Sequence, residues 1–98
     1  MDTHRAMTVH EKDNVATALS DLVIGDWVTL MGPGKPGNIV ANQPIPFGHK
    51  IAIMAIEKGE AIVKYGEVIG RATQQITLGK HVHIHNVESL RGRGDVPE

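Results

Sequence analysis

Residues 22–28 read Leu-Val-Ile-Gly-Asp-Trp-Val: an apolar residue, two residues, a glycine, two residues and a second apolar residue. A glycine at the centre of such a unit predicts a tight turn, because glycine adopts positive φ at little cost. The apolar residue after the turn predicts the start of a short strand. The unit is too short and too unevenly spaced for a solenoid. It favours a mainly β domain of short strands, with further copies at residues 45–51, 56–62 and 76–82.

Glycine and proline mark the other breaks, with 11 Gly and 5 Pro among 98 residues. Residues 31–37 are rich in both and predict a loop between strands at 27–30 and 38–41. Only Val15 to Leu19 predict a helix, one short helix that Asp13 or Asn14 would cap; a capped turn is the alternative. The length fits a single domain over residues 1–98, whose ends at 1–6 and 91–98 we expect to be flexible.

The composition excludes several classes of protein and site. Ten Lys and Arg stand against eleven Asp and Glu, a balance that argues against a nucleic-acid partner. The chain has no cysteine, which excludes disulfides, cysteine-zinc sites and thiol nucleophiles. No apolar run approaches the roughly 20 residues of a membrane helix, and residues 1–13 do not resemble a secretory signal. We therefore expect a cytoplasmic protein that has no membrane partner.

Residues 81–86, His-Val-His-Ile-His-Asn, are the strongest chemical signal from residue types alone. In a strand, side chains two residues apart share a face at a separation of roughly 6.6 Å, so two imidazoles could bind one metal ion. The outer pair would stand roughly 13 Å apart, too far to share that ion. Either His81/His83 or His83/His85 could then form a site. A solvated strand face with surface histidines is an equally good interpretation of the pattern.

Three further polar clusters lie in apolar surroundings, at residues 10–14, 48–50 and 64–67. Their lysines, histidines and tyrosine are groups that can act as acids, bases or anchors for a carboxylate. Residue type alone does not assign their roles, and a surface turn at Gly66 would explain the third cluster equally well.

Together these clusters resemble the small subunit, or N-terminal domain, of the altronate/galactarate dehydratase family. The resemblance covers roughly residues 7–95. It implies an SAF-type β-clip, built of short strands with irregular loops. The stretches that carry it follow the family's order and are residues 10–15, 48–50, 64–70 and 81–87.

The resemblance also implies a function. Enzymes of this family remove water from hexonates or hexarates to give 2-keto-3-deoxy sugar acids, using a divalent metal that is typically Fe(II) and sometimes Mn(II). The chain would be the small subunit of a two-component, altronate dehydratase-like hydro-lyase of hexuronate degradation, acting with a large catalytic subunit. Homo-oligomer formation is a further expectation. The alternatives are a non-catalytic sugar-acid-binding SAF module and the small subunit of a sulfolactate sulfo-lyase.

Finally, the resemblance implies which residues lie at the substrate site. We expect Lys50 or Lys64 to pair with the substrate carboxylate, and a histidine of the His83/His85 pair to hold a metal or carry a proton. The expected catalytic residues are Lys50, Lys64, Tyr65, His83 and His85, with His83 and His85 also the expected metal ligands. The expected substrate-binding residues are His10, Asp13, Asn14 and Asn86.

Overall fold

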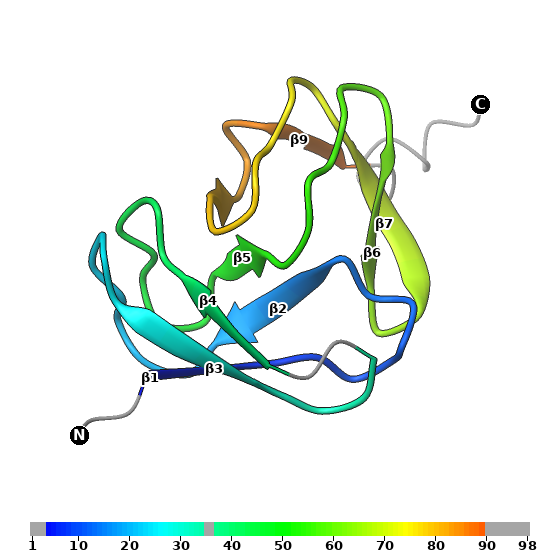
Figure 1. Ribbon diagram of the computed structural model, residues 1–98. Coiled ribbons are helices and arrows are strands. Elements are labelled where there is room, and N and C mark those ends of the chain that lie inside the picture. The colour runs from blue at the N-terminus through cyan, green and yellow to red at the C-terminus, as the bar shows by residue number, and fades with distance from the viewer. Residues whose placement is uncertain (1–3, 35–36, 90–98) are drawn as a thin grey trace.

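A computed structural model describes residues 4–34 and 37–89, and this part of the chain consists of nine strands joined by turns (Figure 1). Six strands form one sheet in the order β4-β3-β1-β2-β5-β8, and three form a second in the order β6-β7-β9. The strands are β1 (His4–Met7), β2 (Val15–Ala18), β3 (Trp27–Met31), β4 (Gly37–Val40), β5 (Lys50–Ala52), β6 (Ala61–Lys64), β7 (Glu67–Ala72), β8 (His81–Val82) and β9 (Val87–Ser89).

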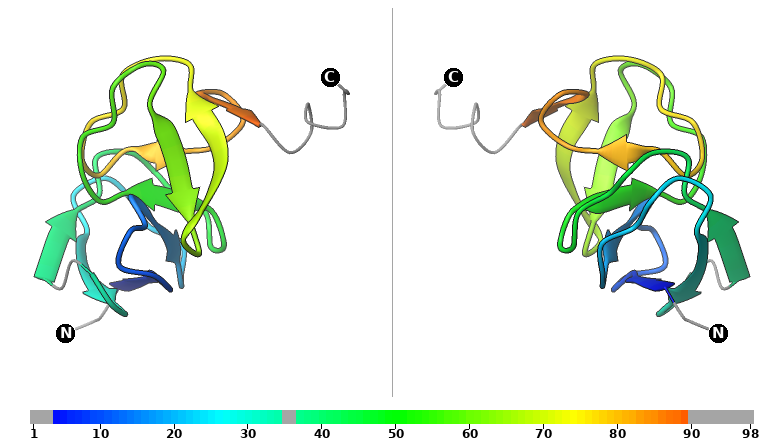
Figure 2. Two further views of the ribbon diagram at one scale, coloured as in Figure 1. Left: turned by 90° about the vertical axis from the view of Figure 1, so that its right-hand side faces the viewer. Right: turned by 90° about the vertical axis from the view of Figure 1, so that its left-hand side faces the viewer.

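Only the β1–β3 pair is parallel among these strands; every other pairing is antiparallel. Seen from the sides in Figure 2, β1 to β4 lie at one end of the molecule and the β6–β7 hairpin at the other, with β5 and β8 between them. The mainly β fold that the sequence predicts is therefore confirmed.

The glycine-centred repeat is confirmed in all four copies. Gly25, Gly48, Gly59 and Gly79 have φ values of +94°, +87°, +90° and +87°. Each glycine N–H donates to the carbonyl of a buried alanine from another segment, at 2.8–2.9 Å. The copies associate in pairs, because their first apolar residues form two antiparallel bridges, Leu22↔Ile45 and Ile56↔Ile76. The repeat thus sets the turns and also links distant parts of the chain.

Two apolar clusters make up the core. One gathers buried residues of β1 to β3 with Leu22, Ile45 and Ile51. The other gathers Val15, Val82 and residues of the second repeat pair. Neighbouring residues of β5 belong to different clusters, Ile51 to the first and Ala52 to the second, because side chains alternate along a strand. The short strand β5 therefore joins the two halves of the core.

The expected helix at residues 15–19 is wrong. Val15–Ala18 is strand β2, which pairs with β1 on one side and β5 on the other. The side chain of Asp13 does not cap a helix here, since it accepts hydrogen bonds from the N–H groups of Val9 and His10, which precede it. Tertiary burial of residues on both faces of β2 has overridden the local capping signal.

The structure also tests the expectations from the sequence for β1, β3 and β4. The strands expected at 27–30 and 38–41 are confirmed as β3 and β4, and residues 32–34 between them belong to no strand. Residues 4–6, expected to belong to a flexible end, are instead part of β1. The rest of the expected flexible ends, 1–3 and 91–98, lies outside the described residues. No helix in the described part is long and apolar enough to cross a membrane.

Candidate functional site

The histidine-rich segment is a short strand followed by a turn. β8 ends at Val82, and Asn86 closes the turn after it. The Asn86 side chain accepts a hydrogen bond from the His83 N–H at 2.9 Å and donates one to the His81 carbonyl at 2.8 Å. The expectation of one extended strand with its outer histidines far apart is therefore wrong. The turn brings the ring centroids of His81 and His85 to 5.1 Å.

A third histidine, His49, completes a group that we call the three-histidine group: His49, His81 and His83. The antiparallel register of β5 and β8 pairs Lys50 with Val82, so the next step places His49 opposite His83. Their rings stack with centroids 4.1 Å apart. Nδ1 of His49 lies 2.9 Å from Nε2 of His81. One potential ligand nitrogen from each of the three residues falls within 4.8 Å of the others.

Burial and neighbouring groups favour the neutral imidazole at two members of this group, His81 and His83. Burial, with His85 and His49 as the next contributors, lowers the pKa of His81 to about 4. Burial and the neighbouring His49 and Lys50 also lower the pKa of His83. A neutral imidazole is the form that binds a metal ion. His81 and His83 can therefore serve as ligands without first losing a proton at neutral pH.

The donor set fits a divalent transition metal. Three imidazoles leave coordination positions for water, substrate or a further protein group, as catalytic sites require. Elsewhere in residues 4–34 and 37–89, no other three His, Asp or Glu ligand atoms gather this closely. The three-histidine group is thus the best metal-binding candidate of the described chain, and it includes His83 but not His85.

Lys50 lies beside the group and faces a cavity of about 210 Å³ together with His83. Its other walls are Ile69, Ile84, Val87 and Ser89. Burial lowers the pKa of the Lys50 ammonium, and the positive charge of Lys64 lowers it further. Two of the expected catalytic residues, Lys50 and His83, therefore line one cavity. The charge of a third, Lys64, acts on Lys50.

Asp13 and Asn14, expected to bind substrate, are both engaged by the backbone. Asp13 is only 2% exposed, and its second carboxylate oxygen accepts the Gly66 N–H at 2.8 Å. Asn14 accepts from the Val63 N–H and donates to the Ala61 carbonyl. These contacts fix the β6–β7 hairpin beside β2, where Figure 1 shows it.

Burial raises the pKa of Asp13, but hydrogen bonds from four backbone N–H groups outweigh this effect and lower the pKa below its ordinary value. A carboxylate that accepts several N–H bonds is stabilised in its charged form. Asp13 is therefore an ionised structural acceptor at neutral pH.

His10 and Tyr65 lie at the β6–β7 turn and not at the three-histidine group. Tyr65 is 55% exposed, with φ of +58°, and lines a separate cavity of about 130 Å³ with Met7, Val9, Thr17 and Leu19. The Lys64 ammonium lies 4.7 Å above the Tyr65 ring centroid. The His10 ring packs so closely against Gly66 that any side chain at that position would collide with it. The structure thus divides the expected site residues between two regions.

The sequence offered His81 with His83 as one of two possible metal-binding pairs, but the expected site residues included neither His49 nor His81. Both come shortly after the glycine of a repeat, at Gly48-His49 and Gly79-Lys80-His81. Because the strands of these two repeats pair antiparallel, the histidines meet across β5 and β8. The repeat was the available signal, but the pairing of its strands is a long-range fact that the local pattern does not contain.

Comparison with known proteins identifies the family of the chain. The altronate/galactarate dehydratase SAF domain matches residues 4–90 of the chain. The chain is 40% identical over 81 residues to the altronate dehydratase of Bacillus subtilis (strain 168), an alignment that covers 83% of the chain but 16% of that relative. It is 35% identical over 74 residues to the galactarate dehydratase (L-threo-forming) of Escherichia coli (strain K12), covering 76% of the chain and 13% of the relative.

A different kind of relative matches over nearly its whole length. The (2R)-sulfolactate sulfo-lyase subunit alpha of Chromohalobacter salexigens is 49% identical over 87 residues, which cover 85% of the chain and 93% of that subunit. The chain thus spans about a sixth of the altronate dehydratase but almost all of the sulfo-lyase subunit. The family match over residues 4–90 and these identities establish that the chain belongs to the altronate/galactarate dehydratase SAF domain family.

Proposed function

We propose that this chain is the small component of a two-component lyase that removes water from a hexonate or hexarate to give a 2-keto-3-deoxy sugar acid. A large catalytic subunit would supply the rest of the active site. The observation that carries the proposal is the three-histidine group, which lies beside Lys50 and a cavity of about 210 Å³. Membership of a family named for dehydratases supports the choice of reaction.

The reaction sets clear chemical needs. A base removes the proton on the carbon next to the carboxylate, the bond from the following carbon to its hydroxyl breaks, and that hydroxyl leaves with a proton as water. The electron pair becomes a carbon–carbon double bond, and the resulting enol rearranges to the 2-keto acid. Negative charge grows on the carboxylate during proton removal, so the site must offer cationic or electrophilic groups there.

His49, His81 and His83 would hold a divalent ion. Imidazole nitrogens suit Fe(II), whereas Mn(II) favours oxygen ligands, so these residues fit Fe(II) better. The bound ion would supply Lewis-acid stabilisation of the charge that develops on the carboxylate. The lowered pKa values of His81 and His83 support this role, because they keep both rings neutral and ready to coordinate.

Lys50 would bind the carboxylate and Lys64 would add a second positive charge nearby. Lys50 is suited to this because it faces the cavity with His83, and burial strengthens its electrostatic interactions. His85 is the candidate proton carrier, because its ring centroid lies 5.1 Å from that of His81. Asn86 would position the histidines through its hydrogen bonds to residues 81 and 83. We assign no substrate contact to Asp13, Asn14, His10 or Tyr65.

A second candidate function is the small subunit of a (2R)-sulfolactate sulfo-lyase. The specific observation in its favour is the 49% identity over 93% of such a subunit. Its chemistry would be closely related, because sulfite rather than hydroxide would leave the carbon next to the one that loses its proton. The same carboxylate charge would develop, so the three-histidine group and Lys50 would serve either reaction.

The test is to purify the chain from its native host with its bound partners and to assay the complex. Altronate, galactarate and (2R)-sulfolactate would be supplied in turn, with and without Fe(II), while 2-keto acid and sulfite are measured. Formation of a 2-keto-3-deoxy acid without sulfite is the expected result. Release of sulfite from (2R)-sulfolactate alone would replace the proposal by the second candidate. Recovery of no large subunit, with no turnover of any acid, would contradict both and leave a binding module.

A further inference from the structure

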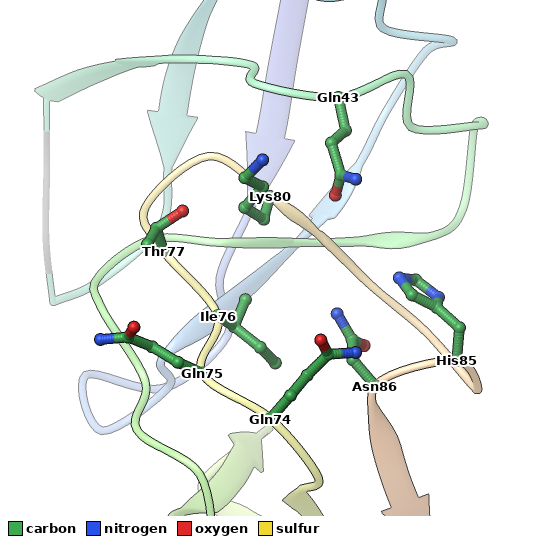
Figure 3. A pocket seen from close by; sticks show the side chains of 8 residues that line it. All are labelled: Gln43, Gln74, Gln75, Ile76, Thr77, Lys80, His85 and Asn86. Carbon is green, nitrogen blue, oxygen red and sulfur yellow. The ribbon is translucent and has the colours of Figure 1, made fainter.

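A second cavity lies at the same histidine turn and belongs to neither the three-histidine group nor the Lys50 cavity. It measures about 270 Å³ and is lined by residues 74–77 and Lys80, by Gln43, and by His85 and Asn86 at the end of the turn (Figure 3). The turn therefore contributes to two cavities, with His83 at the Lys50 cavity and His85 at this one. We call it the amide cavity, after Gln43, Gln74 and Gln75.

The amide cavity has buried residues at its floor and polar residues around its rim. Ile76 is 1% exposed and Asn86 5% exposed, and both line it from within. The Asn86 amide is already engaged in closing the turn. Around them, Gln43 and Lys80 are partly buried, and Gln74 is exposed. Small-molecule sites are usually lined mainly by apolar side chains, so this mainly polar lining suits a ligand that is itself largely polar.

The polar groups offer both donors and acceptors. The Gln43 oxygen accepts the His81 N–H at 2.9 Å, which leaves its NH₂ group available as a donor. The Gln75 NH₂ group donates to the Glu57 carboxylate, which leaves its oxygen available as an acceptor. Within the described chain, the side chains of Gln74, Thr77 and Lys80 make no hydrogen bond or ion pair. These groups can therefore all serve a ligand.

This mixture matches hydroxyl groups better than a simple anion. A hydroxyl both donates and accepts, so it can satisfy the Gln43 donor and the Gln75 acceptor alike. A carboxylate, sulfonate or phosphate only accepts hydrogen bonds, so it would make no use of the Gln75 oxygen. Lys80 is the only charged side chain of the lining, and Ile76 can contact the C–H surface of a carbon chain. The volume suits a small metabolite.

We propose that the amide cavity binds the hydroxyl-bearing carbon chain of an open-chain polyol acid, and so selects for long polyhydroxy acids over short ones. The inference rests on the proposed function for the identity of the acid, since the carboxylate end would lie at Lys50. The turn from His83 to Asn86 connects the two cavities, and the His81 ring contacts His85. Gln43, which lines the amide cavity, also accepts a hydrogen bond from the N–H of His81, a member of the three-histidine group.

The experiment is a nuclear magnetic resonance titration of the full chain, read at the side-chain NH₂ signals of its glutamines. Galactitol is the first probe, because it carries hydroxyls but no carboxylate and needs neither metal nor partner. Adipate, a six-carbon diacid without hydroxyls, is the matched control ligand. We expect galactitol, and not adipate, to shift the signals of Gln43, Gln74 and Gln75. Gln74→Ala should weaken galactitol binding by about three- to tenfold, the effect of one hydrogen bond.

Thr73→Ala is the matched control variant, because Thr73 is exposed and lies outside the cavity lining; it should bind galactitol as the parent chain does. No shift with galactitol, or shifts of equal size with adipate, would overturn the inference. Failure of the proposed function alone would give a different result: galactitol would still shift the glutamine signals, but the complex would dehydrate no sugar acid. If the complex does dehydrate sugar acids, Gln74→Ala should raise KM for them and leave kcat unchanged. An unchanged KM would overturn the inference while the proposed function stands.

Discussion

Asp13 and Asn14 on one side, and the three-histidine group on the other, are both clusters of polar side chains in apolar surroundings, yet they differ in what their polar atoms do. Both oxygens of Asp13 accept backbone N–H groups, and both ends of the Asn14 amide pair with β6. In the three-histidine group, by contrast, the ring nitrogens face one another and the rings stack. The first cluster has no polar atom left for a ligand, whereas the second presents three nitrogens to one point.

The role of a polar residue in this chain follows from its hydrogen-bond partners more than from its residue type. Asp13 and Asn14 stabilise the fold, because a buried polar group that lost its partners would cost free energy. The three histidines add little that the fold requires, since no backbone group within residues 4–34 and 37–89 hydrogen-bonds to their rings. Asn86 stands between the two cases, being a backbone-bonded amide whose partners are the histidines' own backbone groups.

The largest expected effect on activity comes from removing two rings of the three-histidine group. For His81→Ala with His83→Ala we expect turnover by the assembled enzyme to fall by at least about 100-fold, since loss of even one supporting residue of a metal site costs 10- to 100-fold. The midpoint of thermal unfolding should move little. Steady-state kinetics and calorimetry measure the two effects. His4→Gln, which changes a partly buried histidine of β1, is the matched control. Turnover retained by the double variant would contradict the assignment.

Asp13→Ala should show the opposite pattern, a large loss of stability. The N–H groups of Val9, His10 and Gly66 lose the acceptor of partly buried hydrogen bonds. The loss of a hydrogen bond costs about 0.5–1.5 kcal/mol and more when the acceptor is charged, so we expect a loss of about 3 kcal/mol in the free energy of unfolding. Urea unfolding followed by Trp27 fluorescence measures it. Asp21→Ala removes a carboxylate that accepts one exposed N–H, from Phe47, and should cost less than about 1 kcal/mol. Equal losses in the two variants would refute the structural role of Asp13.

Asn86→Ala tests the intermediate case and should affect both properties. Loss of the amide frees the turn, so we expect affinity for a divalent ion to fall by about tenfold, as for other residues that orient metal ligands. Stability should fall by about 1–2 kcal/mol, because the His83 N–H and the His81 carbonyl lose partners. Metal titration calorimetry and urea unfolding report these effects. Reduced stability with unchanged metal affinity would show that Asn86 supports the fold and not the histidines.

The smallest expected effect is a change in acid sensitivity. The pKa of Asp13 is lower in the folded chain than its ordinary value of 3.8, so its ionised form stabilises the fold above that value. This contribution should be lost as the pH falls through the lowered pKa, where the native carboxylate becomes protonated. In Asp13→Asn that part of the decline should vanish, so its stability between pH 5 and pH 2, roughly the range over which such a carboxylate acts, should depend less on pH. Parallel pH profiles of the two proteins would contradict the role of the Asp13 charge.

The turns of the fold could be predicted from the sequence because their determinants are local. Gly48 and its three counterparts specify their own φ and their own turn, so the repeat identifies all four turns. The error at residues 15–19 arose from the same local reasoning. Asp13 followed by Val15 resembles a helix cap, but burial between β1 and β5 selects a strand.

The candidate site could be predicted only in part. Lys50 and His83 were identified from the family resemblance, and the structure places both at one cavity. His49 was missed because it joins His81 and His83 only through the pairing of β5 with β8, which are some 30 residues apart along the chain. The separation of Tyr65 and His10 from the histidines likewise depends on long-range packing that residue order does not reveal.

The central claim is that His49, His81 and His83 form one metal-binding group. The most direct test is a titration of the full chain with Zn²⁺, a diamagnetic ion that imidazole binds well, followed through the ring ¹⁵N resonances of all six histidines. We predict that the ring signals of His49, His81 and His83 shift together and saturate at one ion per chain, while those of His4 and His10 do not move. Independent shifts of single histidines, or saturation without His49, would contradict the claim.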